Sequence, residues 1–291
     1  MNGDDLTLQR AKLSICSTPI GNLSDVSQRL LDTLRSADVV LCEDTRHTRK
    51  LLTHFDIHPL RLVSYHQHNE KARQGWIGEL FASAKHIALV SDAGTPMVSD
   101  PGALIVETAI QLGVDIVPVP GPSALLAGLV GSGLPVTPFV YLGFPPRQQK
   151  ERQAWIEPFA KVPATLVIYE APHRLTSTLA FLLDTLGDRA AVLARELTKR
   201  YETFLRSTLS ALLRDVEANS PRGEYVVMVD NRPSADDLEE DADMSMTSAM
   251  EHVMSALGSG VRHKEAVAEA AQRFGVNRRE LYNMTLKRRD P

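Results

Sequence analysis

The sequence predicts an α/β protein made of two α/β domains, followed by a small all-helical module. Short apolar runs alternate with amphipathic segments as far as residue 230, and in the first part of the chain this alternation is typical of a mostly parallel sheet covered by helices on both faces. The Gly- and Pro-rich stretch GSGLPVTPF interrupts this alternation, and the chain after residue 244 shows only helical periodicity. These observations predict an N-terminal domain at residues 1–135, a second domain at 136–231, an acidic linker at 232–243 and a helical module at 244–291.

Five apolar runs of the first domain predict strands, at Leu13–Cys16, Val39–Cys42, Arg61–Tyr65, His86–Val90 and Asp115–Val119. The segments between and after them predict helices at Val26–Arg35, Thr48–Phe55, Glu70–Ala84, Ala103–Leu112 and Ser123–Val130. The last of these helices is expected to close the first domain, because the break GSGLPVTPF follows it.

The second domain repeats the alternation, with strands expected at Phe139–Leu142, Thr165–Tyr169, Ala190–Ala194 and Tyr225–Val229. Helices are expected at Gln148–Phe159, Leu175–Leu186 and Leu209–Glu217. The polar, acidic stretch that follows lacks the apolar residues of a core and is interpreted as a linker. In the tail, a helix over Lys264–Phe274, a break at Gly275 and a cap at Asn277 predict a helix–turn–helix outline.

Composition excludes several classes of protein. Apolar residues make up 43% of the chain and charged residues 23%, with a net charge of −4, as in a soluble globular protein. There is no run of about eighteen apolar residues and no apolar core of a signal peptide near the start. Cys16 and Cys42 lie in apolar runs and are interpreted as buried reduced thiols, which predicts a cytoplasmic protein.

The loops after the predicted strands of the first domain indicate a ligand site. Ligands of open parallel sheets bind at the carboxyl ends of the strands, and the loops there are STPIGN, EDTRHT, HQHNE, SDAGTPMVSDPG and PGPSA. Small residues such as Ala93 and Gly94 let backbone groups approach a ligand closely. Asp100 is interpreted as a helix cap with a proline after it, and Ser123 as a helix cap, an anion contact, or both.

Other kinds of site have little support. The chain lacks G-x-G-x-x-G after the first strand and lacks a P-loop, which disfavours a dinucleotide or P-loop nucleotide site. His66 and His68 have H-x-H spacing, with His54 and His58 nearby, but no thiol or supporting pattern accompanies them. We therefore expect no metal ion.

The motifs STPIGNLSD, CEDTRHT, LVSDAGTPMVSDPG, VPGPSA, YEAPHR, ARELTK and GEYV together resemble the tetrapyrrole methylase family, and within it the ribosomal RNA branch. The similarity runs from about Lys12 to Asp230, and the helical tail also matches. Ala93, Gly94 and Thr95 stand where relatives of the corrinoid pathway have Gly-Gly-Asp, which favours the RNA branch.

The resemblance implies two α/β domains with S-adenosylmethionine in the cleft between them, and a homodimer. It implies 2′-O-methylation of a cytidine ribose in small-subunit (16S) ribosomal RNA. The cofactor-binding residues that it implies are Pro19, Ala93, Gly94, Thr95, Ser123, Ala124, Tyr169 and Gly223.

A ribose hydroxyl is a weak nucleophile, so a nearby base would help. The candidate bases are Glu170, Glu43 and Lys199, and the sequence does not rank them. Candidate phosphate contacts of the RNA are Arg46, Arg174, Arg195, Arg278 and Arg279. The charged strand ends of the second domain could instead form interdomain ion pairs, and the tail could instead serve dimerisation or stability.

Two other functions remain open at this stage. One is a tetrapyrrole C-methyltransferase on the same fold, which the missing Gly-Gly-Asp and the basic tail disfavour. The other is a non-enzymatic nucleic-acid-binding protein, which the intact small residues of both cofactor loops disfavour.

Overall fold

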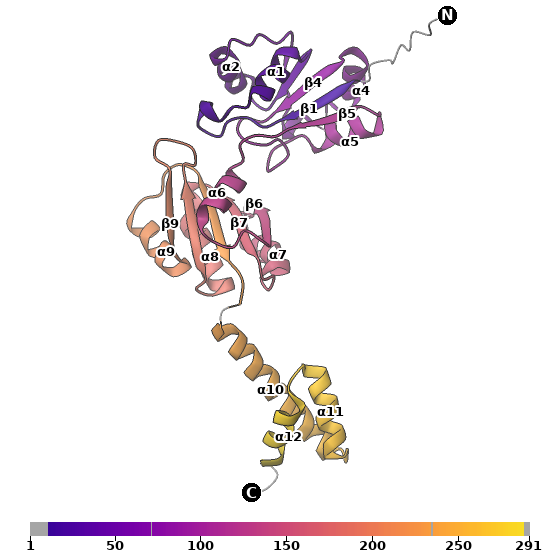
Figure 1. Cartoon of the computed structure of the whole chain (residues 1–291), viewed down its shortest axis with the longest axis vertical. Coiled ribbons are helices and arrows are strands. Elements are labelled where there is room, and N and C mark those ends of the chain that lie inside the picture. Colours follow the sequence, from indigo (N-terminus) through magenta and orange to yellow (C-terminus); the bar gives the residue numbers. More distant parts are fainter. Residues whose placement is uncertain (1–10, 71, 234, 288–291) are drawn as a thin grey trace, which may run out of the picture. The chain divides into compact units, whose positions relative to one another are not determined.

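The computed structural model describes residues 11–70, 72–233 and 235–287 (Figure 1). The chain divides into two compact units between Asn231 and Arg232, where the predicted second domain ends. The first unit holds two five-stranded sheets, and the second unit is helical.

The first sheet is parallel throughout, with the strand order β3-β2-β4-β1-β5. Its strands are β1 Lys12–Cys16, β2 Val39–Cys42, β3 Leu62–Ser64, β4 His86–Val90 and β5 Asp115–Val119. Its helices are η1 Leu23–Asp25, α1 Gln28–Ser36, α2 Thr45–His54, α3 Gln67–Glu70, α4 Gln74–Ser83 and α5 Ala103–Gln111. Alternate strand residues pack to opposite faces: Leu41 packs with the core of α4 and α5, whereas Val40 packs with that of α1 and α2. The predicted two-faced parallel sheet is confirmed.

The second sheet is mixed, with the order β6-β7-β10-β8-β9. Its strands are β6 Phe139–Gly143, β7 Thr165–Glu170, β8 Ala190–Arg195, β9 Thr203–Thr208 and β10 Tyr225–Asp230. The helices α7 Gln149–Ile156, η2 Glu157–Phe159, α8 Pro172–Leu186 and α9 Leu209–Ala218 cover one face. Because β10 runs antiparallel to β7 and β8, its first residues lie at the edge where those two strands end. The sequence did not predict β9, an edge strand whose residues are mostly exposed.

Helix α6, Ala124–Ser132, covers the other face of the second sheet, which corrects its predicted place in the first domain. A Cβ on Gly128 would lie 3.3 Å from Val226 Cγ1, so this glycine permits the close packing of α6 on β10. At the far end of the helix, Arg206 Nε of β9 donates to the carbonyl oxygen of Ser132 at 2.8 Å. The packing boundary between the halves therefore lies before α6 and not at residue 135.

The C-terminal unit consists of α10 Ala235–Gly258, α11 His263–Phe274 and α12 Arg278–Lys287. The predicted acidic linker is thus wrong for most of its length, because α10 begins inside it. Ala, Leu, Glu and Met are good helix formers, and acidic residues suit the start of a helix, so the segment does not need a core of its own to be helical. Val253, Val267 and Leu281 pack in one small core. As predicted, Asn277 caps α12, where its Oδ1 accepts the backbone N–H groups of Arg279 and Glu280.

No helix in the described part of the chain combines the length and the apolar character that crossing a membrane requires.

Candidate cofactor pocket

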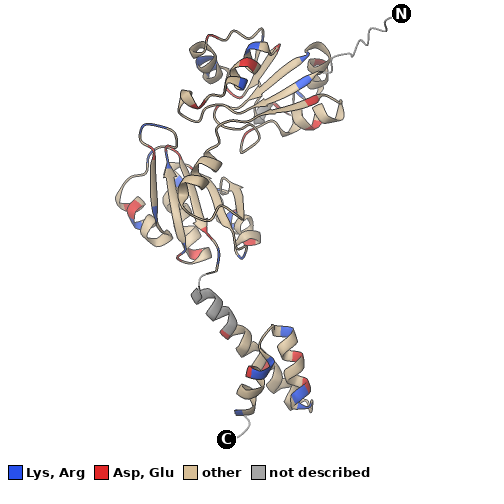
Figure 2. Ribbon diagram, in the orientation of Figure 1, with Lys and Arg blue, Asp and Glu red and all other residues tan. Residues whose placement is uncertain are grey.

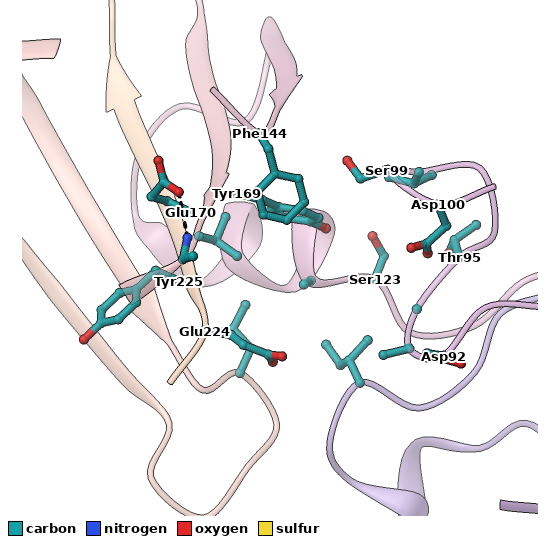
Figure 3. A pocket seen from close by; sticks show the side chains of 18 of the residues that line it. Asp92, Thr95, Ser99, Asp100, Ser123, Phe144, Tyr169, Glu170, Glu224 and Tyr225 are labelled. Carbon is teal, nitrogen blue, oxygen red and sulfur yellow. Dashed lines mark hydrogen bonds between the residues drawn. The ribbon is translucent and has the colours of Figure 1, made fainter. Parts of the chain in front are cut away.

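A pocket of about 420 Å³ lies where the carboxyl edges of the two sheets of the first unit meet (Figure 3). This volume is within the usual range for a small-molecule site. The wall is largely apolar; Asp92 and Asp100 lie on its first-sheet side, and Glu170 and Glu224 lie on its second-sheet side. The lining residues are Ile20, Asp92, Ala93, Gly94, Thr95, Val98, Ser99, Asp100, Ser123, Ala124, Phe144, Tyr169, Glu170, Ala171, Pro172, Leu197, Glu224, Tyr225 and Val226.

The first part of the loop after β4 is tied to the end of β1. Gly94 and Thr18 exchange backbone hydrogen bonds of 2.9 and 3.1 Å, and Gly94 has a φ of +82°. Thr95 Oγ1 lies 2.9 Å from Ser17 Oγ. These bonds fix small residues at the pocket wall, so the backbone itself forms part of the wall.

The second part of this loop turns Asp100 into the pocket. Met97 and Ser99 have φ values of +72° and +69°, a left-handed conformation that costs a non-glycine residue on the order of 1–3 kcal/mol. Helix α5 begins only at Ala103, with Gly102 as its N-cap, so the predicted capping role of Asp100 is wrong. Glu70 Oε1 accepts the Gly102 N–H at 3.3 Å instead. The loop uses twelve residues because it both closes the wall and presents this carboxyl group.

Carboxyl groups interact on this side of the pocket. Burial first, and then the charge of Glu43, raises the pKa of Asp100 to about 6; a hydrogen bond from Ser91 acts in the opposite direction. Burial and the charge of Asp92 also raise the pKa of Glu43, while His66 lowers it. The pocket therefore has an electron-rich side that favours a cationic ligand.

The start of α6 forms the opposite edge. Ser123 has the extended backbone of an N-cap, but no side-chain hydrogen bond caps α6 within the described residues, so the predicted cap bond is absent. The backbone N–H of Leu125 donates to Tyr169 Oη at 2.8 Å, which ties α6 to the end of β7. Ser123 and Ala124 both line the pocket, and the Ser123 hydroxyl is available for a ligand.

The structure brings most of the predicted cofactor residues together. Ala93, Gly94, Thr95, Ser123, Ala124 and Tyr169 all line the pocket. Pro19 is buried and does not line it, whereas its neighbour Ile20 does. Gly223 does not line it either: its φ is +85°, a Cβ there would lie 2.6 Å from Glu196 Oε1, and the next residue, Glu224, faces the pocket. In both cases the residue that follows in the chain lines the pocket.

Glu170 has a structural environment that does not suit a general base. Its carboxylate is fully buried, accepts the Ala171 N–H at 2.8 Å and accepts the Thr178 hydroxyl at 2.5 Å (Figure 3). Arg174 Nε lies 3.6 Å from Glu170 Oε1. Both carboxylate oxygens are thus used in joining β7 to the start of α8.

This environment predicts that Glu170→Gln destabilises the protein. Both carboxylate oxygens accept hydrogen bonds, so the NH2 group of the glutamine side chain would face a donor in place of an acceptor. We expect the free energy of unfolding to fall by about 1–3 kcal/mol, while the affinity for S-adenosylmethionine stays unchanged. Denaturant unfolding and calorimetric titration measure the two quantities. Thr178→Val, which removes one donor and keeps the shape, should give a smaller loss. A variant of unchanged stability that turned over far more slowly would instead make Glu170 catalytic.

The other two candidate bases lie outside the pocket lining. Lys199 Nζ lies 3.0 Å from Glu196 Oε1 and 2.7 Å from Glu224 Oε2. Although burial opposes it, these two hydrogen bonds raise the pKa of Lys199, so the amine stays protonated and cannot act as a base. Glu43 affects the pocket indirectly, because its charge raises the pKa of Asp100.

Two of the three predicted RNA-binding arginines of the first unit are largely or partly buried. Arg174 Nη2 donates to the Pro145 carbonyl oxygen at 2.5 Å, and its side chain is largely buried. Arg195 is half-buried, and its Nε lies buried without a hydrogen-bond partner among the described residues. In contrast, 86% of the Arg46 side chain is exposed, and its Nη2 lies 2.7 Å from Asp44 Oδ2. Of the three, only Arg46 has the exposure that an RNA contact needs.

The pocket residues that the sequence did not predict include Asp92, Asp100, Phe144, Leu197 and Glu224. The two aspartates were visible in SDAGTPMVSDPG, which carries an acidic residue on each side of its small residues. Phe144 and Leu197 had no local signal, because only the pairing of β6, β7 and β8 brings their loops to this edge. No group of histidines, cysteines and carboxylates that could hold a metal occurs in the described part of the chain.

Fold and pocket together define a protein of two α/β halves with a small-molecule site at their shared edge. Residues 12–213 match the family of Tetrapyrrole (Corrin/Porphyrin) Methylases, and residues 245–289 match the RsmI C-terminal HTH domain. The chain therefore belongs to the tetrapyrrole methylase family, in the branch of the ribosomal RNA small subunit methyltransferase I proteins. The resemblance predicted from the motifs is confirmed.

Relatives of this name cover nearly the whole chain. The protein from Halalkalibacterium halodurans is 42% identical over 275 residues, which are 94% of each chain. The protein from Bacillus subtilis is 42% identical over 271 residues, covering 93% of this chain and 92% of its own.

Solved structures confirm the fold of the first unit. Uroporphyrin-III C-methyltransferase from Thermus thermophilus, complexed with S-adenosylhomocysteine, has a TM-score of 0.53 at 21% identity and covers 76% of this chain and 98% of its own. A diphthine synthase has a TM-score of 0.59 at 19% identity and covers 75% of this chain and 89% of its own.

Proposed function

We propose that this protein is an S-adenosylmethionine-dependent methyltransferase that methylates the ribose 2′-oxygen of a cytidine in small-subunit ribosomal RNA. The observation that carries the proposal is the pocket itself, in a chain that matches a relative named ribosomal RNA small subunit methyltransferase I over 94% of its length. The first-sheet side of the pocket has small residues and the carboxyl groups of Asp92 and Asp100, and the second-sheet side has apolar and aromatic side chains together with Glu170 and Glu224.

The residues present fit S-adenosylmethionine, which combines a flat nucleoside with a sulfonium and an ammonium group. Asp100 would face the cationic part of the cofactor, since it is an ionisable carboxyl group turned into the pocket. Phe144 and Tyr169 would contact the nucleoside, with Tyr169 held in place by Leu125 N–H. Gly94 and Ala124 allow the close approach of backbone groups.

When bound, S-adenosylmethionine would supply a methyl group to the ribose oxygen; its sulfur would keep the electron pair of the broken bond, and the hydroxyl proton would be released to solvent. The chain contributes position and exclusion of water, because the apolar wall formed by Ile20, Val98 and Leu197 encloses the reacting groups. None of Glu170, Glu43 and Lys199 offers a free base to the pocket, so we assign the main catalytic contribution to positioning.

The test is to incubate the protein with methyl-labelled S-adenosylmethionine and, separately, with small ribosomal subunits lacking the modification and with a uroporphyrinogen. We expect label on a ribose 2′-oxygen of the rRNA alone. Label on the tetrapyrrole would support the C-methyltransferase alternative. RNA binding with no transfer to either substrate would support a non-enzymatic binding protein.

Helix α2 provides a basic surface beside the pocket for the RNA. Arg46, Arg49 and Lys50 are exposed on it, and the helix itself contains no acidic residue. Its N-cap residue, Asp44, donates its backbone N–H to the pocket residue Asp92 at 3.0 Å. We assign to this helix contacts with backbone phosphates, which position an RNA without reading its sequence.

The exposed face of α6 is suited to binding a second copy of the chain. The helix is apolar all round, which is typical of a buried helix, yet Leu126 and Val130 are 52% and 73% exposed. Val136 and Phe139, which follow in the chain, are 47% and 40% exposed. We propose that this surface pairs with another copy in a homodimer.

Val130→Glu is expected to convert the homodimer to monomers, because it places a charge in the proposed apolar interface. Analytical ultracentrifugation at micromolar concentration measures the change. Leu60→Glu is the matched control, since Leu60 is 87% exposed and outside this surface. The proposal fails if the unmodified protein is already monomeric or if the α6 variant remains dimeric.

Two buried, unpaired thiols support a cytoplasmic location. Burial raises the pKa of Cys16 to about 12 and that of Cys42 to about 11, so both are inert thiols.

A further inference from the structure

A basic notch lies in the C-terminal unit, between the first turns of α11 and α12. It is an open depression of about 450 Å³ lined by Lys264, Arg278, Arg279 and Tyr282. Lys264 comes from α11 and the other three residues from α12. Figure 2 marks the Lys and Arg positions of these two helices in blue along the ribbon.

The three cations of the notch are exposed, and no ion pair involves any of them within the described residues. Other basic residues of the same unit already have partners: Arg262 Nη2 lies 2.6 Å from Glu265 Oε1, and Arg273 stacks on Phe274. Cations that converge without a counter-charge repel one another, and an anionic ligand would relieve that repulsion.

The fourth residue of the notch is an aromatic ring with a fixed orientation. Tyr282 is half-buried, and its ring centroid lies 4.7 Å from that of His263, with 35° between the planes. His263 Nε2 lies 2.9 Å from Thr285 Oγ1, and that hydroxyl also bonds to the Leu281 carbonyl oxygen. A ring that is held in this way can serve as a platform for a second flat group.

We propose that the notch binds one unstacked nucleotide of single-stranded RNA, with its phosphates on Lys264, Arg278 and Arg279 and its base on Tyr282. The proposal rests on the proposed function for the RNA being ribosomal. Cations beside an aromatic platform are the usual means of binding single strands. Duplex RNA fits less well, because its bases are stacked and its major groove is too narrow for side chains to read.

Two kinds of variant separate the two parts of the notch. In the full-length protein, Arg278→Gln with Arg279→Gln should weaken binding of a short unstructured RNA about tenfold and reduce the slope of log affinity against log salt by about 1.4. Tyr282→Leu should weaken binding about 5- to 100-fold without changing that slope, because stacking releases no counterions. Fluorescence anisotropy with a labelled oligonucleotide measures both.

The controls keep this test separate from that of the methyltransferase. Arg273→Gln removes a charge from the same unit outside the notch and should leave RNA affinity near that of the unmodified chain. Affinity for S-adenosylmethionine should be the same in every variant, so a failed notch would not affect the proposed activity. Deleting residues 232–291 should remove the notch-dependent part of RNA binding and spare cofactor binding.

Three results would overturn the proposal. The first is an unchanged affinity and salt slope in the double arginine variant, whose two residues are exposed and do not belong to the core. The second is equal loss of binding to duplex RNA of the same length, which would indicate shape recognition of a helix. The third is loss of ribosomal-subunit binding with unchanged binding to RNA, which would indicate an acidic protein partner.

Discussion

Replacing Gly94 by valine is expected to abolish the binding of S-adenosylmethionine while the protein stays folded. Gly94 has a φ of +82°, which a β-branched residue adopts only with strain. A Cβ at this position would already lie 3.4 Å from Ile20 Cγ2 and 3.9 Å from the Pro122 carbonyl oxygen. The two additional methyl groups would have to occupy the pocket or displace the loop. We expect affinity to fall by more than about 100-fold, the effect of losing roughly 3 kcal/mol.

Calorimetric titration and thermal unfolding test this prediction together. Gly113→Val is the matched control: Gly113 has a φ of +69°, but no atom lies within 4 Å of a Cβ built on it, and it does not line the pocket. The control should lose a similar amount of stability through backbone strain and keep its affinity for the cofactor. Unchanged affinity in Gly94→Val would show that the loop after β4 does not contact the cofactor.

The first sheet could be predicted from the sequence because its strands β1, β2 and β4 are buried on both faces. A strand such as His86–Val90 is fully buried, so it appears in the sequence as a short unbroken apolar run between turn residues. The carboxyl ends of these strands then fix which loops meet, whatever the side-chain details. Gly94, Ser123 and the other small residues of these loops were therefore predictable as one site.

The second sheet and its neighbours were harder to predict because their arrangement depends on long-range pairing. The residues of β9 alternate only weakly in burial, and its place at the edge follows from its antiparallel pairing with β8. Helix α6 follows a strand of the first sheet and yet packs on the second, and no local pattern distinguishes these two outcomes. Glu224 reaches the pocket only because β10 runs antiparallel between β7 and β8.

The place of Asp100 in the pocket wall was missed for a different reason. Asp followed by Pro is a good local signal for the start of a helix, and the helix does begin nearby. The structure gives the capping position to Gly102 and holds the preceding residues in left-handed conformations, with Glu70 bonding the freed N–H groups. A local rule is thus broken at the point where the chain presents a carboxyl group to the pocket, and strained residues are common at functional sites.

Asp100→Asn is expected to lower the affinity for S-adenosylmethionine about 10- to 100-fold, because a hydrogen bond or ion pair to a charged group contributes about 1.5–3 kcal/mol. The substitution keeps the size of the side chain and removes only the charge. Asp92→Asn is the control: Asp92 also lines the pocket, but its Oδ1 already accepts the Asp44 N–H at 3.0 Å, so the loss of affinity should be smaller. Equal affinities in the unmodified protein and Asp100→Asn would exclude a charge contact with the cofactor.

The same carboxyl group should make cofactor binding depend on pH. The pKa of Asp100 is raised to about 6, so this side chain gains a proton as the pH falls through that value, and a cationic ligand then loses its partner. For a single group, affinity should fall about tenfold between pH 7.5 and pH 5, and Asp100→Asn should flatten the profile.

Glu43→Gln provides the decisive comparison. The charge of Glu43 raises the pKa of Asp100, so its removal should move the midpoint of the profile to lower pH without abolishing it. Burial, the larger cause, remains in that variant, so the midpoint should still lie above the ordinary value of an aspartate. Asp92, Tyr141 and Tyr169 also face this group, and all three are unchanged in both variants. If the pH profile of cofactor affinity were the same in Asp100→Asn as in the unmodified protein, the titrating group would be another residue of the pocket.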